Sequence, residues 1–306
     1  MRINMRENKG YRLLYLYERL NRGECLHKAE LAQTFGVTGK TIQRDIEDLR
    51  AYLAETRLED GEAYILYDRK RDGYVLSHAE SEWLTQEDVL AVCKILLESR
   101  AFCKEELDSL LRKLLHQTAP NDRKQVGKMI GNELFYYVPL RHGRKLLTVI
   151  WALSRLCIEQ EILRIIYRRQ DGMKRIHEVK PIAVMFSEYY FYLIAYMADG
   201  RKDFPTIFRI DRIADFTPTG EKFSIPYRDK FSDGEFRKRV QFMYAGKLRC
   251  VTFTYSGASI EAILDRLPTA KILSEKNGIY RITTEVYGNG IDMWLKSQGD
   301  KVTVEK

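Results

Sequence analysis

The sequence predicts a chain of several domains in the α+β class. Three observations support this class: the first half of the chain has apolar residues at helical spacing, a central region consists of short strands, and the last region alternates strands with helices. A length of 306 residues suggests two or three domains, and 45% hydrophobic with 31% charged residues is typical of a globular protein. The sequence lacks the roughly eighteen consecutive apolar residues that a membrane helix needs.

The first region, residues 1–78, begins with three predicted helices. Tyr11–Leu20 has apolar residues at helical spacing, and residues 28–35 form a short second helix that Gly36 can cap in a left-handed conformation. Thr38 is a suitable N-cap for the third helix, over residues 38–53. The buried stripe of this helix is predicted to be Ile42, Ile46, Leu49 and Leu53.

Two helices, a glycine turn and a third helix with a polar outer face are typical of a helix-turn-helix, whose last helix enters the major groove of DNA. Two strand-like runs, 64–67 and 74–76, follow and enclose a basic loop. This loop is interpreted as a wing that contacts phosphates, and a solvated turn is the alternative. The predicted DNA-binding residues are Thr38, Lys40, Thr41, Gln43, Arg44, Arg69, Lys70 and Arg71.

Residues 79–138 read as a helical connector. A helix is expected to begin at Thr85, a second apolar stripe ends before Pro120, residues 121–124 look like a loop, and a further helix is expected over 125–134. Such a connector could form a core or pair two chains. We expect a homodimer, held by the connector and the C-terminal region, because a major-groove reader usually acts as a two-fold pair on a palindromic site.

The third region, residues 139–226, follows Pro139. A helix over 144–158 is expected to precede strands, which suit a small barrel or sheet: 162–169, 174–180, 182–186, 189–197 and 206–211. Residues 139–239 carry 20 Lys and Arg against 13 Asp and Glu, a net charge of +7 that accounts for most of the total of +8. This concentration predicts that the region prefers an anionic partner.

An aromatic hairpin, residues 190–196, and a basic run, residues 208–213, dominate this region. Because neighbouring strand residues face opposite sides, the side with Leu193 is expected to be core and the side with Tyr192 to face outward. A base could then stack on the ring while guanidinium groups hold its phosphates. The predicted effector-binding residues are Tyr192, Arg209 and Arg212, with Arg168, Arg175, His177 and Lys180 as contributors. The alternative is that Arg212 pairs with Asp211 or Asp215 and braces the strands.

The last region, residues 227–306, begins with a polar bridge over 227–240. The elements that follow are expected to be strand 249–255, helix 258–267, strand 270–275, strand 279–286, helix 289–297 and strand 301–305. The order βαββαβ predicts a ferredoxin-like unit.

Several of these stretches resemble one family of bacterial transcription regulators. The segments Ala29–Ala32 and Lys40–Ile46 are similar to the winged helix-turn-helix that heads regulators with a WYL domain. The hairpin and the basic run resemble the WYL domain itself, although Phe191 replaces its tryptophan and Thr206-Ile207 replaces its usual Tyr-Arg. Residues 289–299 resemble the C-terminal extension of the same regulators. The resemblance implies that residues 139–226 form a small Sm-like β-barrel that senses an effector.

Two functions remain open at this point. The first is a DNA-binding transcriptional regulator, with double-stranded operator DNA as partner and a nucleotide or single-stranded nucleic acid as effector. The second is a nucleic-acid-binding accessory protein that modulates a partner nuclease or a defence system. The complete helix-turn-helix favours the first.

We expect no enzyme, no cofactor and no metal site. The sequence contains no phosphate-binding glycine loop and no His-Glu-x-x-His motif. The five cysteines are scattered without zinc spacing, so they are expected to be reduced and structural. Met1–Arg6 lacks the features of a secretory signal, which predicts a cytoplasmic protein.

Overall fold

The computed structural model describes residues 8–56, 64–77, 84–118, 120–225 and 231–305. The chain divides into two compact units, which are Met1–Glu98 with Asp108–Tyr136 and Ser99–Leu107 with Tyr137–Lys306. The segment Met1–Arg6 and the expected boundaries near residues 78 and 226 lie outside the described residues. The division into four domains therefore stays a prediction.

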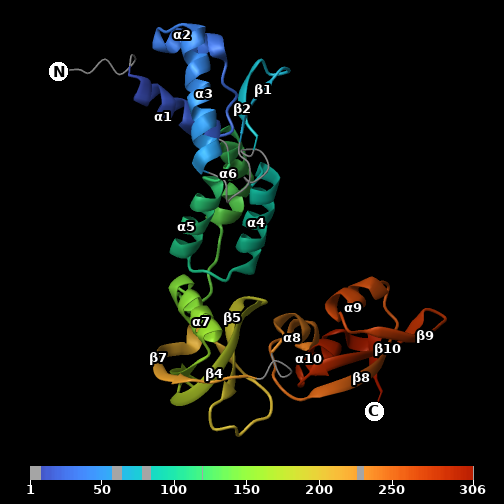
Figure 1. Ribbon diagram of the computed structural model, residues 1–306. Helices are drawn as coiled ribbons and strands as arrows, with labels where there is room; N and C mark the ends of the chain where they lie inside the picture. The colour runs from blue at the N-terminus through green and yellow to red at the C-terminus, as the bar shows by residue number, and fades with distance from the viewer. Residues whose placement is uncertain (1–7, 57–63, 78–83, 119, 226–230, 306) are drawn as a thin grey trace. The chain divides into compact units, whose positions relative to one another are not determined.

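The first unit begins with a helix-turn-helix followed by a β-hairpin (Figure 1). Its elements are α1 (Lys9–Asn21), α2 (Lys28–Phe35), α3 (Gly39–Thr56), β1 (Ile65–Asp68) and β2 (Gly73–Leu76). The predicted helices and strands are confirmed to within a few residues. All members of the predicted α3 stripe are buried, and they share one core with Leu16, Leu20, Leu31 and Phe35.

Local signals in the sequence fix the ends of these helices. Gly36 caps α2 with a φ of 67°, which is the left-handed conformation that glycine adopts without steric cost. The backbone N–H of Thr41 donates to the hydroxyl of Thr38 at 3.3 Å, so Thr38 caps α3 as predicted. The turn between α2 and α3 is thus set by residue chemistry, and it fixes the start of α3.

A buried ion pair joins α1 to α3. Arg12 Nε donates to Asp45 Oδ2 at 2.8 Å and Arg12 Nη2 donates to Oδ1 at 3.3 Å, while the two residues are only 5% and 1% exposed. The hydrophobic pattern of α3 gave no sign of this pair, because Asp45 sits on the buried side beside Ile46. Removing one partner would take away a charge-assisted contact from the other, which is buried.

The hairpin β1–β2 is attached to the segment between α1 and α2. Tyr74 and Leu26 exchange two backbone hydrogen bonds of 2.8 and 2.9 Å. The strand passes so close that a Cβ on Gly73 would lie 2.5 Å from Cys25 Sγ. Only glycine fits there, and the hairpin is therefore held against the helices at a fixed position.

The connector consists of α4 (Gln86–Ser99), α5 (Lys104–Leu115) and α6 (Pro120–Phe135). The expected loop at residues 121–124 is wrong, because α6 already begins at Pro120. Proline is favoured in the first turn of a helix, where its missing N–H costs no hydrogen bond, and the polar residues that follow lie in the first turns of α6.

The second unit contains a five-stranded antiparallel sheet preceded by α7 (Leu147–Glu159). The strands are β3 (Glu161–Arg168), β4 (Lys174–Ser187), β5 (Tyr190–Met197), β6 (Thr206–Arg209) and β7 (Ile213–Lys222), in the order β6-β5-β4-β3-β7. No ladder between β6 and β7 occurs in the described part of the chain, so a closed barrel is not confirmed.

Three details of this sheet differ from the prediction. The two strands expected at 174–180 and 182–186 are one strand, β4, with a register shift between Pro181 and Ala183. The strand expected to reach residue 211 ends at Arg209, and a short 3-10 turn, η1 (Ile210–Arg212), follows. Strand β7 was not predicted, because most of its side chains are exposed and its sequence is polar.

The C-terminal part follows α8 (Asp233–Arg239) and has the predicted element order. Its elements are β8 (Leu248–Tyr255), α9 (Ile260–Arg266), β9 (Lys271–Lys276), β10 (Ile279–Tyr287), α10 (Gly290–Ser297) and β11 (Val302–Val304). The strands form one antiparallel sheet in the order β11-β8-β10-β9. Phe253, Ile282 and Ile291 are fully buried in its core.

Candidate nucleic-acid and effector sites

The first candidate site is the N-terminal half of α3. Thr38, Lys40, Gln43 and Arg44 are exposed, whereas Thr41 is half-buried. Gln43 Nε2 donates to Glu47 Oε1 at 3.4 Å, a long bond that leaves the amide available. Within the described residues, Lys40 and Arg44 form no ion pair.

The turn between β1 and β2 adds three more cations to the helix-turn-helix region. Arg69, Lys70 and Arg71 are exposed. Asp68 shapes the turn, since its Oδ1 accepts hydrogen bonds from the backbone N–H groups of Lys70 at 2.7 Å and Arg71 at 3.2 Å. These bonds lower the pKa of the Asp68 carboxyl. The Asp68 carboxylate also lies 3.7 Å from Arg71, so Arg69 and Lys70 are the less restrained cations of the turn.

Taken together, α3 and the turn offer amide, hydroxyl and cationic groups on one small domain. Side-chain amides and guanidinium groups read base edges in the major groove, and cations contact phosphates. The arrangement can therefore supply both kinds of contact that a DNA reader needs.

The second candidate site is the hairpin of β4 and β5. The expectation that only one face of β5 is core is wrong. Leu193 is buried against α7 and the sheet, as predicted, but Ile194 is also fully buried, in a second cluster that includes Phe236 of α8. Tyr192 packs against this second cluster and is half-buried, so its ring does not face outward as predicted. Period-two alternation cannot reveal that a later segment covers the other face.

Tyr190, which was not among the predicted site residues, holds the aromatic position that we expected for Tyr192. The guanidinium carbon of Arg209 lies 3.4 Å from the centroid of the Tyr190 ring. At the edge of the guanidinium, Arg209 Nε and Nη2 donate to the two carboxylate oxygens of Asp211 at 3.0 and 2.8 Å. The guanidinium is thus fixed by an aromatic face and a bidentate ion pair.

The ion pair changes the roles of the arginines in this site. The bracing expected for Arg212 is carried out by Arg209, which pairs with Asp211, while Arg212 is half-buried in η1 with no ion pair among the described residues. Burial raises the pKa of Tyr192 to about 12, so its hydroxyl remains protonated at neutral pH.

The loop before α7 adds two residues that the sequence did not single out. Arg144 Nη1 donates to the backbone oxygens of Asp211 at 2.9 Å and Ile213 at 2.5 Å, which holds η1 in place. Burial lowers the pKa of His142, with Asp211 opposing that shift and Arg209 reinforcing it. Both residues lie in an irregular segment, where periodicity carries no information.

The remaining predicted effector residues do not join Arg209. Arg175 and His177 line a separate cavity of about 270 Å³ near the start of β4. Arg168 is exposed at the end of β3 and Lys180 is half-buried on β4, and neither residue lines that cavity. The predicted residues therefore do not form one site: Arg175 and His177 line the cavity, whereas Arg168 and Lys180 join neither the cavity nor Arg209.

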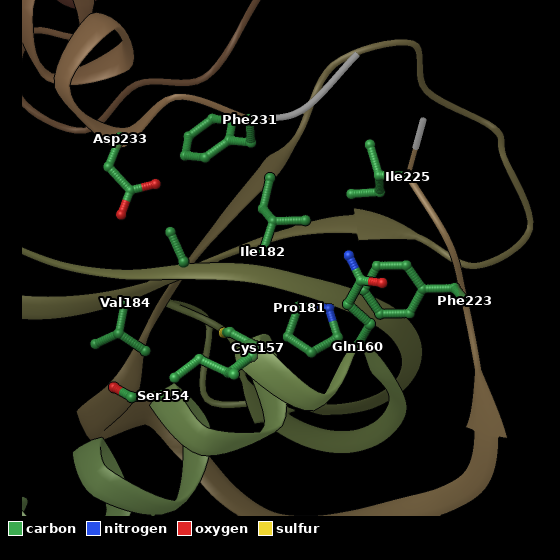
Figure 2. A pocket seen from close by; sticks show the side chains of 12 residues that line it. Ser154, Cys157, Gln160, Pro181, Ile182, Val184, Phe223, Ile225, Phe231 and Asp233 are labelled. Carbon is green, nitrogen blue, oxygen red and sulfur yellow. The ribbon is translucent and has the colours of Figure 1, made fainter. Parts of the chain in front are cut away.

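A larger cavity of about 650 Å³ lies between α7, β4 and α8 (Figure 2). Its lining is mostly apolar, with Asp233 as the one charged lining residue among those described. Burial raises the pKa of Cys157 to about 12, so the thiol in this lining is not a thiolate at neutral pH. This cavity suits neither an anion nor a nucleophilic reaction.

The described residues contain no group of three or more His, Cys, Asp or Glu side chains that could hold a metal ion. In the same part of the chain, every helix is too short or too polar to cross a membrane.

Comparison with protein families identifies both domains. Residues 12–75 match the model of an HTH domain, and residues 148–218 match the model of the WYL domain. The chain therefore carries an HTH domain and a WYL domain, as its sequence predicted. These domain families are regulatory, and together they support a DNA-binding regulator.

Similar solved structures include the proteasome accessory factor B/C (PafBC) of Arthrobacter aurescens, at 18% identity and a TM-score of 0.30 over 96% of this chain. This chain spans 44% of the PafBC chain. A CRISPR Cas-related protein aligns at 13% identity and a TM-score of 0.37, over 99% of this chain and 79% of its own. The manganese regulator SloR aligns at 15% identity and a TM-score of 0.16, over 71% of this chain and 99% of its own. All three TM-scores are below 0.5, so the domain assignment rests on the family models. Comparison with curated proteins gave no match.

Proposed function

We propose that this protein, with its HTH domain and WYL domain, is a transcriptional regulator that binds operator DNA and senses an anionic effector. The observation that carries the proposal is the pairing, in one chain, of two domains: an HTH domain with exposed cations on α3, and a WYL domain in which the Arg209 guanidinium of β6 is fixed over Tyr190 of the aromatic hairpin. No catalytic role is part of the proposal.

On the DNA side, α3 enters the major groove and Gln43 reads a base edge. An amide can bond an adenine through two hydrogen bonds, and the weak bond of Gln43 to Glu47 leaves it free to do so. Lys40 and Arg44, which are on the same helix, contact DNA phosphates. Arg69 and Lys70 contact the DNA backbone from the turn between β1 and β2.

On the effector side, the ligand is a nucleotide or a short single-stranded nucleic acid. Arg209 lies flat over Tyr190, so a base can stack on the outer side of this guanidinium. Arg212 has no acidic partner among the described residues and lies in the neighbouring turn, where it can hold a phosphate. The ring of Tyr192 packs edge-on against that of Tyr190, with 6.4 Å between the ring centroids.

The regulator acts as a homodimer, because a single helix-turn-helix buries too little DNA contact for strong specificity. Exposed apolar side chains on the connector support a protein contact there. They are Ile95 on α4, Met129 and Phe135 on α6, and Tyr136 just after it. Scattered exposed apolar residues are ordinary, but three on two neighbouring helices and one just after them support a contact surface on the connector.

The architecture that we propose around these sites is an Sm-like barrel followed by a ferredoxin-like unit. The continuous path from β6 through η1 into β7 supports the barrel, since it joins the two edge strands of the five-stranded sheet. The strand order β11-β8-β10-β9 supports the ferredoxin-like unit.

Footprinting on the intergenic DNA beside the gene tests the proposal. We expect the purified protein to protect an inverted repeat, and a nucleotide or a short oligonucleotide to change that protection. Arg212→Ala should abolish the effector response and keep the operator affinity and the melting temperature of the wild type. Binding of single strands without any protected duplex site would favour the accessory role, and loss of folding in Arg212→Ala would assign this arginine to structure.

A further inference from the structure

A cationic cavity lies on the five-stranded sheet, and Arg209 is not among its lining residues. On β6, Thr206 and Phe208 face the opposite side from Arg209, because neighbouring strand residues alternate. The cavity, of about 270 Å³, opens on this opposite side near the turn that joins β3 to β4. Its polar lining residues are Arg169, Arg175, His177, Arg201, Lys202 and Thr206.

The positive charge in this cavity is only partly neutralised. Arg169 pairs with Asp171 at 3.4 Å, and Arg201 pairs with Asp199 at 3.1 Å. Arg175 and Lys202 have no acidic partner among the described residues. Two cations are therefore left to balance a ligand that carries about two negative charges.

Two buried polar atoms in the lining residues have no hydrogen-bond partner. They are His177 Nδ1 and Thr206 Oγ1. A buried polar atom without a partner is rare in folded proteins and costs about 1–3 kcal/mol, so such atoms call for an explanation. A ligand in the cavity would supply the missing partners.

Aromatic rings form the apolar wall of the same cavity. Phe208 lies 5.1 Å from Tyr167 and 5.7 Å from His177 between ring centroids. This wall gives the cavity one apolar side, while its cations are exposed to solvent.

We propose that this cavity binds the phosphate monoester group of a small ligand, as a site separate from the effector surface at Arg209. A phosphate monoester carries up to two negative charges and three terminal oxygens, which match the two unpaired cations and the Thr206 hydroxyl. A carboxylate has one charge and two oxygens and would leave one of these groups unmatched. The site does not depend on the proposed DNA binding.

The lowered pKa of His177 reflects its burial and the cations around it, which would also attract an anion. Burial lowers its pKa, and Arg201, Arg175 and Arg169 lower it further, while Asp199 acts in the opposite direction. A bound phosphate would add negative charge beside the ring and raise this pKa, so ligand binding should draw a proton onto His177.

Calorimetric titration of the full chain tests the proposal, with inorganic phosphate, adenosine monophosphate, unphosphorylated adenosine and a six-nucleotide single strand as probes. We expect the monophosphate and inorganic phosphate to bind and adenosine not to bind. Arg175→Gln should lower the affinity for the monophosphate about ten-fold or more, the typical loss for a charge-assisted contact. Thr206→Val keeps the side-chain shape and should lower the affinity for the monophosphate several-fold.

Arg164→Gln is the matched control, since Arg164 pairs with Glu178 on the same sheet and does not line the cavity. It should leave the affinity within about two-fold of the wild type. Inorganic phosphate has no base to stack on Arg209, so its loss of binding in Arg175→Gln separates this site from the effector surface. By NMR, the pKa of His177 should rise when phosphate is added.

Several results would overturn the proposal. They are unchanged affinity for the monophosphate in Arg175→Gln, no binding of either phosphate probe at millimolar concentration, and binding that Arg209→Gln removes while Arg175→Gln spares it. If Arg175→Gln weakens only the single strand, the cavity belongs to a nucleic-acid surface and the small-ligand assignment is wrong. None of these outcomes depends on whether operator DNA is bound.

Discussion

The helix-turn-helix and the aromatic hairpin hold their cations in opposite ways. On α3, Lys40 and Arg44 are exposed and form no ion pair among the described residues. Beside the hairpin, Arg209 of β6 is 21% exposed and is fixed by the Tyr190 ring and the Asp211 carboxylate. The first arrangement keeps the charge available, and the second fixes its geometry.

This difference suggests two kinds of recognition. Exposed cations attract any polyanion and release counterions when they bind it, so their contribution falls with added salt. A fixed guanidinium is already partly neutralised, and it gains mainly from a ligand whose shape fits the ring and the adjacent turn. We therefore expect DNA binding to depend on charge and effector binding to depend on geometry.

The largest expected effect comes from the ion pair that positions α3. Asp45→Ala removes the carboxylate that pairs with the buried Arg12, and we expect the free energy of unfolding to fall by about 3–5 kcal/mol. The matched control is Asp48→Ala, which removes the exposed pair with Lys9 on the same two helices. It should cost only about 0–1 kcal/mol. Denaturant unfolding of both variants measures the difference.

Equal losses in the two variants would contradict the importance of burial at Asp45. A large loss for Asp45→Ala alone would show that the buried ion pair, and not the exposed one, holds α3 against α1.

The second prediction concerns base reading by α3. Gln43→Ala should cost about 1–3 kcal/mol of operator affinity and relax the preference at one base pair, because a bidentate amide contact carries that much discrimination. Affinity measured for a set of operators with single substitutions provides the test. A uniform loss over all sequences would instead make Gln43 a backbone contact.

The third prediction breaks the fixed geometry of Arg209. Asp211→Asn keeps the side-chain shape and removes the charge, and it should destabilise the second unit by about 1–2 kcal/mol. This value is in the lower part of the range for charge-assisted bonds, because the guanidinium is partly exposed to solvent. Effector affinity should fall even though the net positive charge increases. If the variant binds the effector more tightly, charge outweighs geometry at this site.

The smallest expected effect is a pH dependence of the second unit. Burial lowers the pKa of both His142 and His177 in the folded state. The unfolded chain therefore binds more protons at low pH, and the free energy of unfolding should fall as the pH decreases below about 6.5, the ordinary pKa of histidine. Thermal unfolding from pH 8 to pH 5 measures this slope. His177→Gln should flatten it, and an identical slope would contradict the assignment.

Much of the fold could be predicted from local patterns. The α3 stripe, the Thr38 cap and the Gly36 cap follow from helical periodicity and capping chemistry, and all are present. The C-terminal element order follows from alternating strand and helix patterns. These features depend on residues that are close in sequence.

The features that were missed depend on residues far apart in sequence. The sequence pattern of α3 suggests that Asp45 is a surface residue. It is buried because it pairs with Arg12, which is 33 positions away in the sequence. Strand alternation predicts that Tyr192 is exposed. It is half-buried because α8, more than 40 residues later in the sequence, covers its face of the sheet. The residues of the effector set were grouped by strand position but do not form one site, because β4 is one long strand and Arg175 is at its far end from the hairpin turn.

The salt dependence of operator binding tests most directly the claim that α3 binds DNA through free cations. Fluorescence anisotropy with a labelled operator would compare the wild type, Lys40→Ala, Arg44→Ala and the control Lys113→Ala, which removes an exposed cation from α5. We predict that each α3 variant reduces the slope of log affinity against log salt by about 0.9, the value for one lost phosphate contact, while the control leaves it unchanged. Wild-type affinity and slope in both α3 variants would contradict the assignment of α3 as the DNA-binding helix.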